Sequence, residues 1–357
     1  MGHGQGNINS RAGQMNIAEQ LIAKAEQLSP FSPLEAESLM EEILCGRIES
    51  AEIVRFLLAL NLRVIHPDEL SAFARAIRRR AAPVFANGVT PPANMVDTCG
   101  TGGDGCGTFN ISTPAAIVAA AAGARVAKHG NRSVSSKCGS ADVLEALGVR
   151  IDIPLERAGQ AIREVGIGFL FAPAAHAAAR HAVPARKQIG KRTVFNLLGP
   201  LTNPAHAENQ VLGVFSADLI DLVASTLAEL GVKHAFVVHG AGGLDEISTA
   251  GETLIAEVRD GAVKRSVVSP DDFGLPQAPI EALRGDTPQE NAALIRRIFE
   301  GEPGPCRDIV VMNASAALVV TGIAANFREG AALAEQTIES GAAAHKLEEL
   351  RAFTNAT

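Results

Sequence analysis

The sequence of 357 residues carries a formal net charge of −7 at pH 7, and 47% of its residues are hydrophobic. That length and apolar content predict a folded chain with a sizeable core, divided into one large and one smaller domain or into two comparable ones. The acidic balance excludes a general polyanion-binding protein, so an anion site must be local and no nucleic-acid partner is expected.

The cysteines and the apolar runs argue against a disulfide framework, a thiolate metal site and a membrane span. The five cysteines are odd in number and contain no Cys-x-x-Cys pair, and no signal peptide is recognisable, so we expect reduced thiols and a cytoplasmic protein. The longest strongly apolar run, Ala115 to Ala122, is too short to cross a bilayer. Residues 1–14 are expected to form a disordered polar tail.

Residues 15–86 predict a small helical domain. One helix is expected to begin at Pro33 and to end near Gly46, and another to begin at Pro67, with acidic residues first and arginines last, as the helix dipole favours. The segment Ile53 to Leu62 is apolar on more than one face. We therefore expect it to be buried on two sides, either inside this chain or at a subunit interface.

Residues 87–357 predict a large α/β domain with a mostly parallel central sheet. Short β-like runs alternate with helical ones, as at Arg125 to Gly130 and at His234 to Gly240, which is the rhythm of strand and helix in parallel sheets. A further helical, basic segment at about 174–192 is expected to rejoin the N-terminal helices in space.

Five glycines fall within the eight positions from Gly100 to Gly107, directly before a helix-start pattern. The stretch satisfies G-x-G-x-x-G, but no Asp or Glu occurs from Gly105 to Ala141, so the acid that holds a ribose in a dinucleotide fold is missing. That acid-free segment instead carries basic residues, which predict an anion site with more than one charge to neutralise. These residues are Arg125, Lys128, Arg132 and Lys137.

Bare backbone in this stretch would let successive N–H groups approach phosphate oxygens. Ser112 or Thr113 is expected to cap a helix that begins at Pro114, and a second helix follows Ser140. Two helix N-termini and a lysine predict a diphosphate site. A glycine-rich turn that serves only chain reversal is the alternative.

Adjacent acidic residues, Asp245 and Glu246, follow a predicted strand and a flexible turn. Isolated carboxylates in loops are usually only solvated. Beside a cluster of phosphates, however, they supply what Mg²⁺ prefers, which is one or two carboxylates with substrate oxygens as further ligands. We therefore expect this pair to bind metal.

A basic block precedes a turn-rich stretch and consists of Arg186, Lys187, Lys191 and Arg192. Most charge runs form solvated faces, but one of these residues could hold a carboxylate as a fork. The histidines lack the spacing of a zinc site, and no G-x-S-x-G nucleophile motif occurs. His129, beside the predicted phosphate loop, is open between a structural and a substrate-contacting role.

Four sequence blocks together resemble the anthranilate phosphoribosyltransferase family, and the resemblance covers essentially all of Met15 to Phe353. In chain order, the blocks are GTGGDG with FNIST, KHGNRSVSSKCGSADVLEALG, RKQIGKRTVFNLLGPLTNP and HGAGGLDEIS. The resemblance implies a small helical and a large α/β domain, an active site in the cleft between them, and a homodimer through the helical domains. It also implies anthranilate and 5-phosphoribosyl diphosphate as substrates and two Mg²⁺ ions per monomer, with no residue assigned as general acid or base.

The resemblance also implies roles for individual residues. Those of the diphosphosugar site are Gly100, Gly103, Asp104, Thr108, Asn110, Ile111, Ser112, Thr113, Lys128, His129, Gly130, Asn131, Arg132, Ser133, Val134, Ser135, Ser136 and Ser140. Those that would contact anthranilate are Gly100, Asn131 and Arg186, and those that would take part in metal binding are Ser112, Asp245 and Glu246.

Two other functions are weighed against this one. A pyrimidine nucleoside phosphorylase is similar in overall fold but needs no acid pair for Mg²⁺, so Asp245 and Glu246 argue against it. A non-catalytic paralogue that binds nucleic acid is opposed by the acidic net charge.

Overall fold

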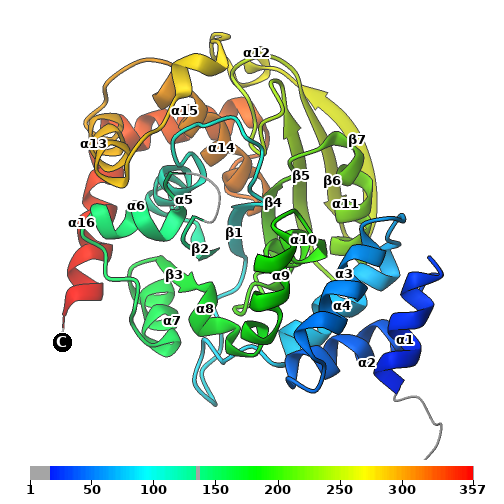
Figure 1. Cartoon of the computed structure of the whole chain (residues 1–357). Coiled ribbons are helices and arrows are strands. Elements are labelled where there is room, and N and C mark those ends of the chain that lie inside the picture. The colour runs from blue at the N-terminus through cyan, green and yellow to red at the C-terminus, as the bar shows by residue number, and fades with distance from the viewer. Residues whose placement is uncertain (1–16, 134–136, 357) are drawn as a thin grey trace, which may run out of the picture.

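The computed structural model describes residues 17–133 and 137–356, so the tail predicted for residues 1–14 lies outside the described residues. Four helices form a helical domain beside a larger α/β domain (Figure 1). They are α1 (Ile17–Glu26), α2 (Pro33–Leu44), α3 (Ser50–Leu60) and α4 (Pro67–Arg79). The predicted helix starts at Pro33 and Pro67 are confirmed, and in both helices a glutamate of the first turn bonds back to the backbone of the capping residue.

A seven-stranded sheet forms the centre of the α/β domain, in the order β3-β2-β1-β4-β5-β6-β7. Its strands are β1 (Met95–Gly100), β2 (Arg125–Gly130), β3 (Ile167–Phe171), β4 (Asn209–Gly213), β5 (His234–Gly240), β6 (Thr253–Arg259) and β7 (Ala262–Val268). Strands β1 to β5 pair in parallel, whereas β6 and β7 add an antiparallel hairpin at one edge. The predicted mostly parallel sheet is confirmed.

Helices cover both faces of the sheet. Successive strand residues point to opposite sides, and here both sides carry apolar residues that need to be buried. Val211 and Phe236 point into one apolar core, and their neighbours Leu212 and Val237 point into the other, which the helical domain shares. The helices that pack directly against the strands are α5 (Ser112–Ala121), α7 (Leu155–Glu164), α11 (Ile220–Glu229) and α14 (Pro305–Val320). The helices that pack against other helices of the domain are α6 (Ser140–Ala146), α12 (Pro270–Phe273), α13 (Pro288–Phe299), α15 (Phe327–Glu339) and α16 (Ala342–Asn355). Across the two described ranges, no helix is both long and apolar enough to cross a membrane.

The chain leaves the sheet after β3 and packs against the helical domain before it returns to β4. This connector consists of α8 (Ala172–Ala175), the 3₁₀ helix η1 (Ala177–Ala182), α9 (Val183–Ile189), α10 (Val194–Leu198) and η2 (Pro200–Thr202). Helix α9 lies against α3, and η1 lies against α2. Ala182 and Ala185 are fully buried in the same core as the N-terminal helices, so the basic block of the sequence is carried on the helical side of the molecule.

Helix α3 buries one face and leaves another open. Ile53, Phe56 and Leu60 are buried, whereas Leu58 is 45% exposed and Leu62, in the turn after the helix, is 75% exposed. The predicted burial on two sides is therefore only partly met within this chain, because an apolar strip stays on the surface.

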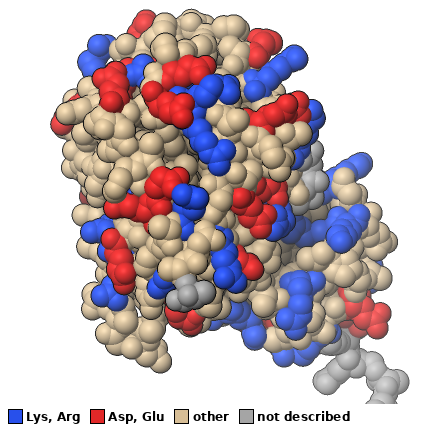
Figure 2. All heavy atoms as spheres, turned by 90° about the vertical axis from the view of Figure 1, so that its left-hand side faces the viewer, with Lys and Arg blue, Asp and Glu red and all other residues tan. Residues whose placement is uncertain are grey.

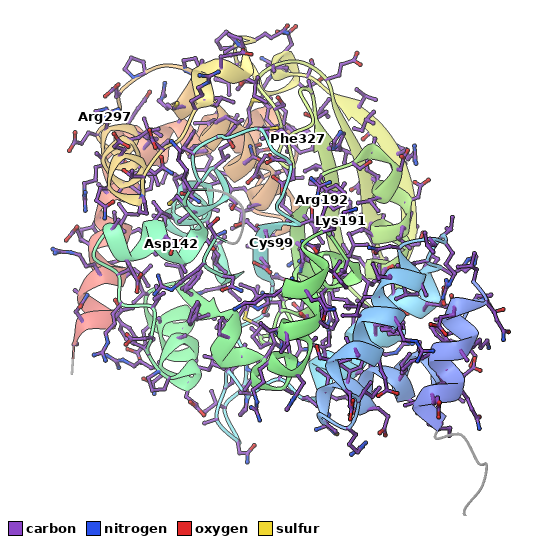
Figure 3. All side chains as sticks on the ribbon, in the orientation of Figure 1. Cys99, Asp142, Lys191, Arg192, Arg297 and Phe327 are labelled. Atoms are coloured by element: carbon purple, nitrogen blue, oxygen red, sulfur yellow. The ribbon has the colours of Figure 1, made fainter. Side chains whose placement is uncertain are left out.

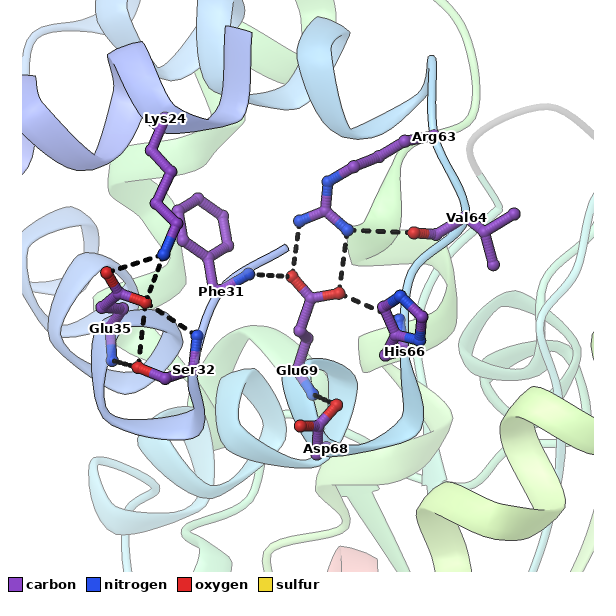
Figure 4. Close-up of polar contacts among 9 residues, drawn as sticks. All are labelled: Lys24, Phe31, Ser32, Glu35, Arg63, Val64, His66, Asp68 and Glu69. Carbon is purple, nitrogen blue, oxygen red and sulfur yellow. Dashed lines mark hydrogen bonds and ion pairs between the residues drawn. The ribbon is translucent and has the colours of Figure 1, made fainter. Parts of the chain in front are cut away.

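A buried ion pair between Arg63 and Glu69 holds two turns of the helical domain together (Figure 4). Glu69 is 0% exposed, and its carboxylate accepts hydrogen bonds from the Phe31 N–H at 2.7 Å, the His66 N–H at 2.9 Å and the Arg63 guanidinium at 2.8 Å. Burial by itself raises the pKa of Glu69, but these donors outweigh it and lower the pKa below its usual value. The ionised carboxylate thus ties the turns before α2 and before α4 to one point.

Replacing Glu69 should destabilise the helical domain far more than breaking an exposed ion pair does. Glu69→Ala leaves the Arg63 guanidinium buried without its counter-charge, which costs about 3 to 5 kcal/mol of unfolding free energy, measured by chemical denaturation. Glu26→Ala, which removes the exposed partner of Arg55, is the control and should leave the midpoint almost unchanged. Equal midpoints for both variants would contradict the role given to Glu69.

Candidate functional site

Four of the five parallel strands end on glycine, and these ends form the floor of the candidate site. They are Gly100 of β1, Gly130 of β2, Gly213 of β4 and Gly240 of β5. The chain passes from β1 to β2 on one side and later adds β4 on the other, so the strand order reverses beside β1. Parallel sheets bind ligands at the carboxyl ends of their strands at such a reversal.

The glycine floor leaves room for the acid pair. A Cβ at Gly100 would overlap the Asp245 carboxylate, and a Cβ at Gly213 would overlap the Asp245 main chain. The loop after β5 therefore lies directly on the ends of β1 and β4. The Gly102 N–H donates to Asp245 Oδ2 at 2.8 Å, so the two motifs that the sequence keeps far apart meet here.

The glycine-rich loop, residues 101–111, joins β1 to α5. At its tip Gly102 and Gly103 have φ of 66° and 76°, the left-handed region that glycine enters without steric cost. Five residues predicted for the diphosphosugar site lie along this loop: Gly103, Asp104, Thr108, Asn110 and Ile111. At its tip the loop thus presents backbone rather than side chains.

Helix α5 begins earlier than predicted and has no side-chain cap. Ser112 rather than Pro114 is its first residue, and neither Ser112 nor Thr113 caps it, so that expectation is wrong. The Ser112 hydroxyl instead accepts a hydrogen bond from Lys128 Nζ at 3.2 Å, and the Ser112 N–H donates toward the Glu246 carboxylate. Lys128 and Glu246, both distant in sequence, thus contact the start of the helix in place of a local cap. The helix N-terminus faces the acid pair.

Of the four basic residues in the acid-free segment, Lys128 is the one buried in the site. It is 2% exposed, its ammonium donates to the Thr98 carbonyl at 2.7 Å, and burial lowers its pKa. The predicted cluster of four charges is not formed, because the other three bind groups elsewhere. Arg125 donates to carbonyls of Ile162 and Arg163, Arg132 pairs with Asp142 and Glu145, and Lys137 pairs with Asp286.

The two adjacent carboxyl groups are crowded and lack a full counter-charge. Burial, with the nearby Asp104 charge, raises the pKa of Asp245 to about 7, and burial with the Asp245 charge raises the pKa of Glu246 to about 8. A divalent cation would supply the missing charge. Within the described ranges no group of three or more His, Cys, Asp and Glu side chains could hold a metal. Mg²⁺ commonly uses one or two carboxylates and takes further ligands from substrate phosphates.

A second wall of the site runs from the end of β2 to α6. A Cβ at Gly130 would overlap the Ser140 hydroxyl, which donates to the Asn131 carbonyl at 3.2 Å. The Asn110 amide reaches across to the Cys138 carbonyl at 3.0 Å and so joins this wall to the glycine loop. The Ser133 N–H donates to Asp142 at 3.0 Å. Three further predicted site residues, Val134, Ser135 and Ser136, lie outside the described residues.

The structure separates the four members of the basic block. Lys187 and Lys191 are exposed, and Arg192 donates to the Gly103 carbonyl. Arg186 is half-buried, with its guanidinium carbon 5.3 Å from the centroid of the Phe195 ring, and burial alone lowers its pKa. No charged or hydrogen-bonding group of the described chain acts on that guanidinium, so it is available to a carboxylate ligand.

Two histidine rings meet near the end of β2: His129 is buried, and His176, which follows α8, is half-buried. The ring centroids of His129 and His176 are 5.1 Å apart. Burial, together with His176, lowers the pKa of His129 to about 3, and burial lowers the pKa of His176 to about 4, so both rings are neutral at pH 7. In the described structure His129 Nε2 makes no hydrogen bond. His176 was not predicted as a site residue, because only the pairing of β2 with β3 brings it here.

Two further residues that were not predicted from the sequence support the floor from below. Asp97 Oδ1 accepts a hydrogen bond from the His129 N–H at 3.0 Å, and Asn203 Nδ2 donates to the Ala127 carbonyl at 2.7 Å. Both side chains are buried. The one signal in the sequence was an aspartate inside a short strand that is otherwise uncharged.

Cavity volume alone does not locate this site. A cavity of about 1020 Å³ opens beside Met95, at the opposite end of β1, and is lined among others by Arg78 and His206. None of the predicted site residues lines it. The strand ends and their glycines, rather than the volume, mark the place where the motifs converge.

Comparisons with known proteins agree with this geometry. Residues 18–81 match the family described as "Glycosyl transferase family, helical bundle domain", and residues 92–344 match "Glycosyl transferase family, a/b domain". The anthranilate phosphoribosyltransferase of Desulforamulus reducens is 52% identical over 324 residues, which cover 91% of this chain and 93% of that protein.

Two solved structures extend the likeness to the fold. The crystal structure of anthranilate phosphoribosyltransferase from Thermus thermophilus has a TM-score of 0.89 and 45% identity, covering 94% of this chain and 99% of that one. The Saccharomyces cerevisiae enzyme, in complex with PRPP and Mg, has a TM-score of 0.84 and 28% identity, covering 96% of this chain and 97% of that one. The chain belongs to the anthranilate phosphoribosyltransferase family.

Proposed function

We propose that this chain transfers the phosphoribosyl group of 5-phosphoribosyl diphosphate to the amine of anthranilate. The products are N-(5-phosphoribosyl)anthranilate and diphosphate, in the biosynthesis of tryptophan. The observation that carries the proposal is the acid pair seated on glycine strand ends, with Asp245 in hydrogen-bond contact with the tip of the glycine-rich loop. That arrangement puts a metal site and a phosphate-binding backbone side by side.

The diphosphosugar is assigned to the glycine-rich loop, the end of β2 and Ser140. Backbone N–H groups of the loop and of the first turn of α5 donate to phosphate oxygens. Lys128 adds a buried positive charge, and its contact with the Ser112 hydroxyl orients that residue toward the acid pair. The loop gives these donors without side chains that would keep the phosphates away.

Two Mg²⁺ ions are proposed to bind to Asp245, Glu246 and Ser112 together with oxygens of the diphosphate. When bound, the ions neutralise negative charge that accumulates on diphosphate as it leaves the anomeric carbon. The raised pKa values of both carboxyl groups support this assignment, because burial and neighbouring carboxylates disfavour their charged forms and a bound cation would favour them.

Anthranilate is proposed to contact Gly100, Asn131 and Arg186, with the Arg186 guanidinium as the fork for its carboxylate. An aromatic amine is neutral at pH 7, so its lone pair can attack the anomeric carbon before the proton is lost. No strong general base is then required, and the neutral His129 is not assigned as one. Rate acceleration comes from positioning the amine and from stabilising the departing charge.

Two copies of the chain are proposed to associate through the helical domains, over the apolar strip that includes Leu58 and Leu62. We also assign the protein to the cytoplasm. None of the five cysteines forms a disulfide in the described part of the chain, as expected in a reducing compartment.

The alternative functions are not favoured. A nucleoside phosphorylase would have no use for the acid pair that occupies the glycine floor. A nucleic-acid-binding role calls for a continuous basic surface, yet on the face in Figure 2 positive and negative side chains alternate over both parts of the molecule.

The first test is the loss of anthranilate fluorescence when the protein is mixed with 5-phosphoribosyl diphosphate. A decay that requires Mg²⁺ and stops when the metal is chelated is expected, since the acid pair cannot stabilise diphosphate without a cation. Turnover that survives exhaustive chelation would contradict the metal assignment and favour the phosphorylase.

Gly213→Ala should strongly reduce turnover. The added Cβ meets the main chain of Asp245 and lifts the acid pair from the ends of β1 and β4. A displacement on the order of 1 Å is expected to reduce kcat/KM by about 100-fold or more. Gly199→Ala is the matched control, because its Cβ would have the Phe195 carbonyl as nearest neighbour, at 3.9 Å. Wild-type activity in Gly213→Ala would exclude the glycine floor as a requirement.

Arg186→Ala should raise the KM for anthranilate by roughly 10- to 100-fold, because a charge-assisted fork to the carboxylate is lost. The KM for 5-phosphoribosyl diphosphate should change little in the same steady-state assay. Lys187→Ala, at an exposed neighbouring position, serves as control. Equal effects of Arg186→Ala on both substrates would mean that its role is misassigned.

A further inference from the structure

The tip of the glycine-rich loop contacts two side chains that come from distant parts of the chain. Asp245 accepts a hydrogen bond from the Gly102 N–H, and Arg192 donates to the Gly103 carbonyl. Both glycines have positive φ, and neither has a side chain with which to fix its own conformation. These two contacts therefore have to offset the conformational freedom of the tip.

Arg192 is itself held in place by the rest of the molecule. Its guanidinium carbon lies 4.1 Å from the centroid of the Phe215 ring, in cation–π contact, and its backbone carbonyl accepts a hydrogen bond from Asn61 Nδ2 at 2.9 Å. Asn61 is the C-cap residue of α3, so this bond anchors Arg192 to the helical domain. Figure 3 labels Arg192 and Lys191 where the chain turns between α9 and α10.

Phe215 connects the same set of contacts to the base of the loop. Its N–H donates to Thr101 Oγ1 at 3.1 Å, and the Thr101 N–H donates to the Gly213 carbonyl at 2.9 Å. A Cβ at Gly103 would lie 3.2 Å from Arg192 Nε, so the guanidinium packs against bare backbone. A continuous series of contacts therefore joins the base of the loop, through Phe215 and Arg192, to its tip.

We propose that Arg192 is a positioning residue that holds the tip of the glycine-rich loop in its phosphate-binding conformation and ties it to the helical domain. The effect on catalysis rests on the proposed function, in which Asp245 is a ligand of Mg²⁺. A carboxylate engaged with a cation is a weaker acceptor for Gly102, so among the described residues Arg192 then provides the remaining side-chain contact to the tip. Because Arg192 donates its hydrogen bond to a carbonyl of the loop, it does not occupy the N–H groups that would face phosphate.

Amide hydrogen exchange without any ligand tests the restraint independently of the chemistry. In Arg192→Ala, peptides that span residues 99–107 should exchange about tenfold faster than in the wild type, since a charge-assisted hydrogen bond and a cation–π contact are both lost. Lys191→Ala is the matched control, because Arg192, although both side chains are exposed, is the one that contacts the Gly103 carbonyl and the Phe215 ring. Unchanged exchange in Arg192→Ala, or the same increase in Lys191→Ala, would overturn the proposal.

Steady-state kinetics then separate positioning from a general loss of structure. Arg192→Ala should raise the KM for 5-phosphoribosyl diphosphate roughly tenfold and leave kcat within about threefold. Arg192→Lys should recover part of the loss, because an ammonium donates to the carbonyl but does not stack on Phe215 as a planar group. A lower kcat with unchanged KM would overturn the positioning role. Absence of any transfer by the wild type would instead refute the proposed function, while the exchange experiment still decides the restraint.

Discussion

Bare backbone at the ends of the parallel strands is the constraint on which the site depends. The loop that carries Asp245 and Glu246 rests on Gly100 and Gly213, at separations that any Cβ would prevent. Because those strands are neighbours in the sheet, the acid pair is brought onto the end of β1, from which the glycine-rich loop starts. The acid pair and the glycine-rich loop, proposed as metal ligands and phosphate donors, are thus brought together by the absence of side chains at these glycines.

The connector after β3 carries Arg186 and Arg192, which are positioned differently from the acid pair. The connector packs Ala182 and Ala185 into the core of the helical domain, so Arg186 and Arg192 are positioned by that domain, whereas the acid pair is positioned by the sheet. Burial raises the pKa of both acids, with a further rise from Asp104 at Asp245 and from Asp245 at Glu246, whereas burial lowers the pKa of Lys128. Each of these groups is therefore stabilised in its charged form when an opposite charge arrives. A magnesium diphosphate brings both kinds of charge at once.

Local sequence patterns predicted much of the architecture. The helix starts at Pro33 and Pro67, the strands that end at Gly130 and Gly240, and the mostly parallel sheet all follow from residues close together in the chain. The cap expected at Ser112 or Thr113 is not formed, because the contacts at this helix start come from residues distant in the sequence. There a buried lysine and a carboxylate distant in sequence offer the helix start partners that no local pattern contains.

The sequence by itself determined that a bare glycine stretch, an acid pair and a basic block exist, because each is a run of neighbouring residues. Only the tertiary structure decided which charges belong to the site. Lys128 is buried there, whereas Arg132 and Lys137 are neutralised by Glu145 and Asp286. Arg186 was left available to a ligand, and Arg192 was turned onto the loop. Lys137, for example, pairs with Asp286, which lies 149 residues further along the chain. Local spacing in the sequence does not predict partners of this kind.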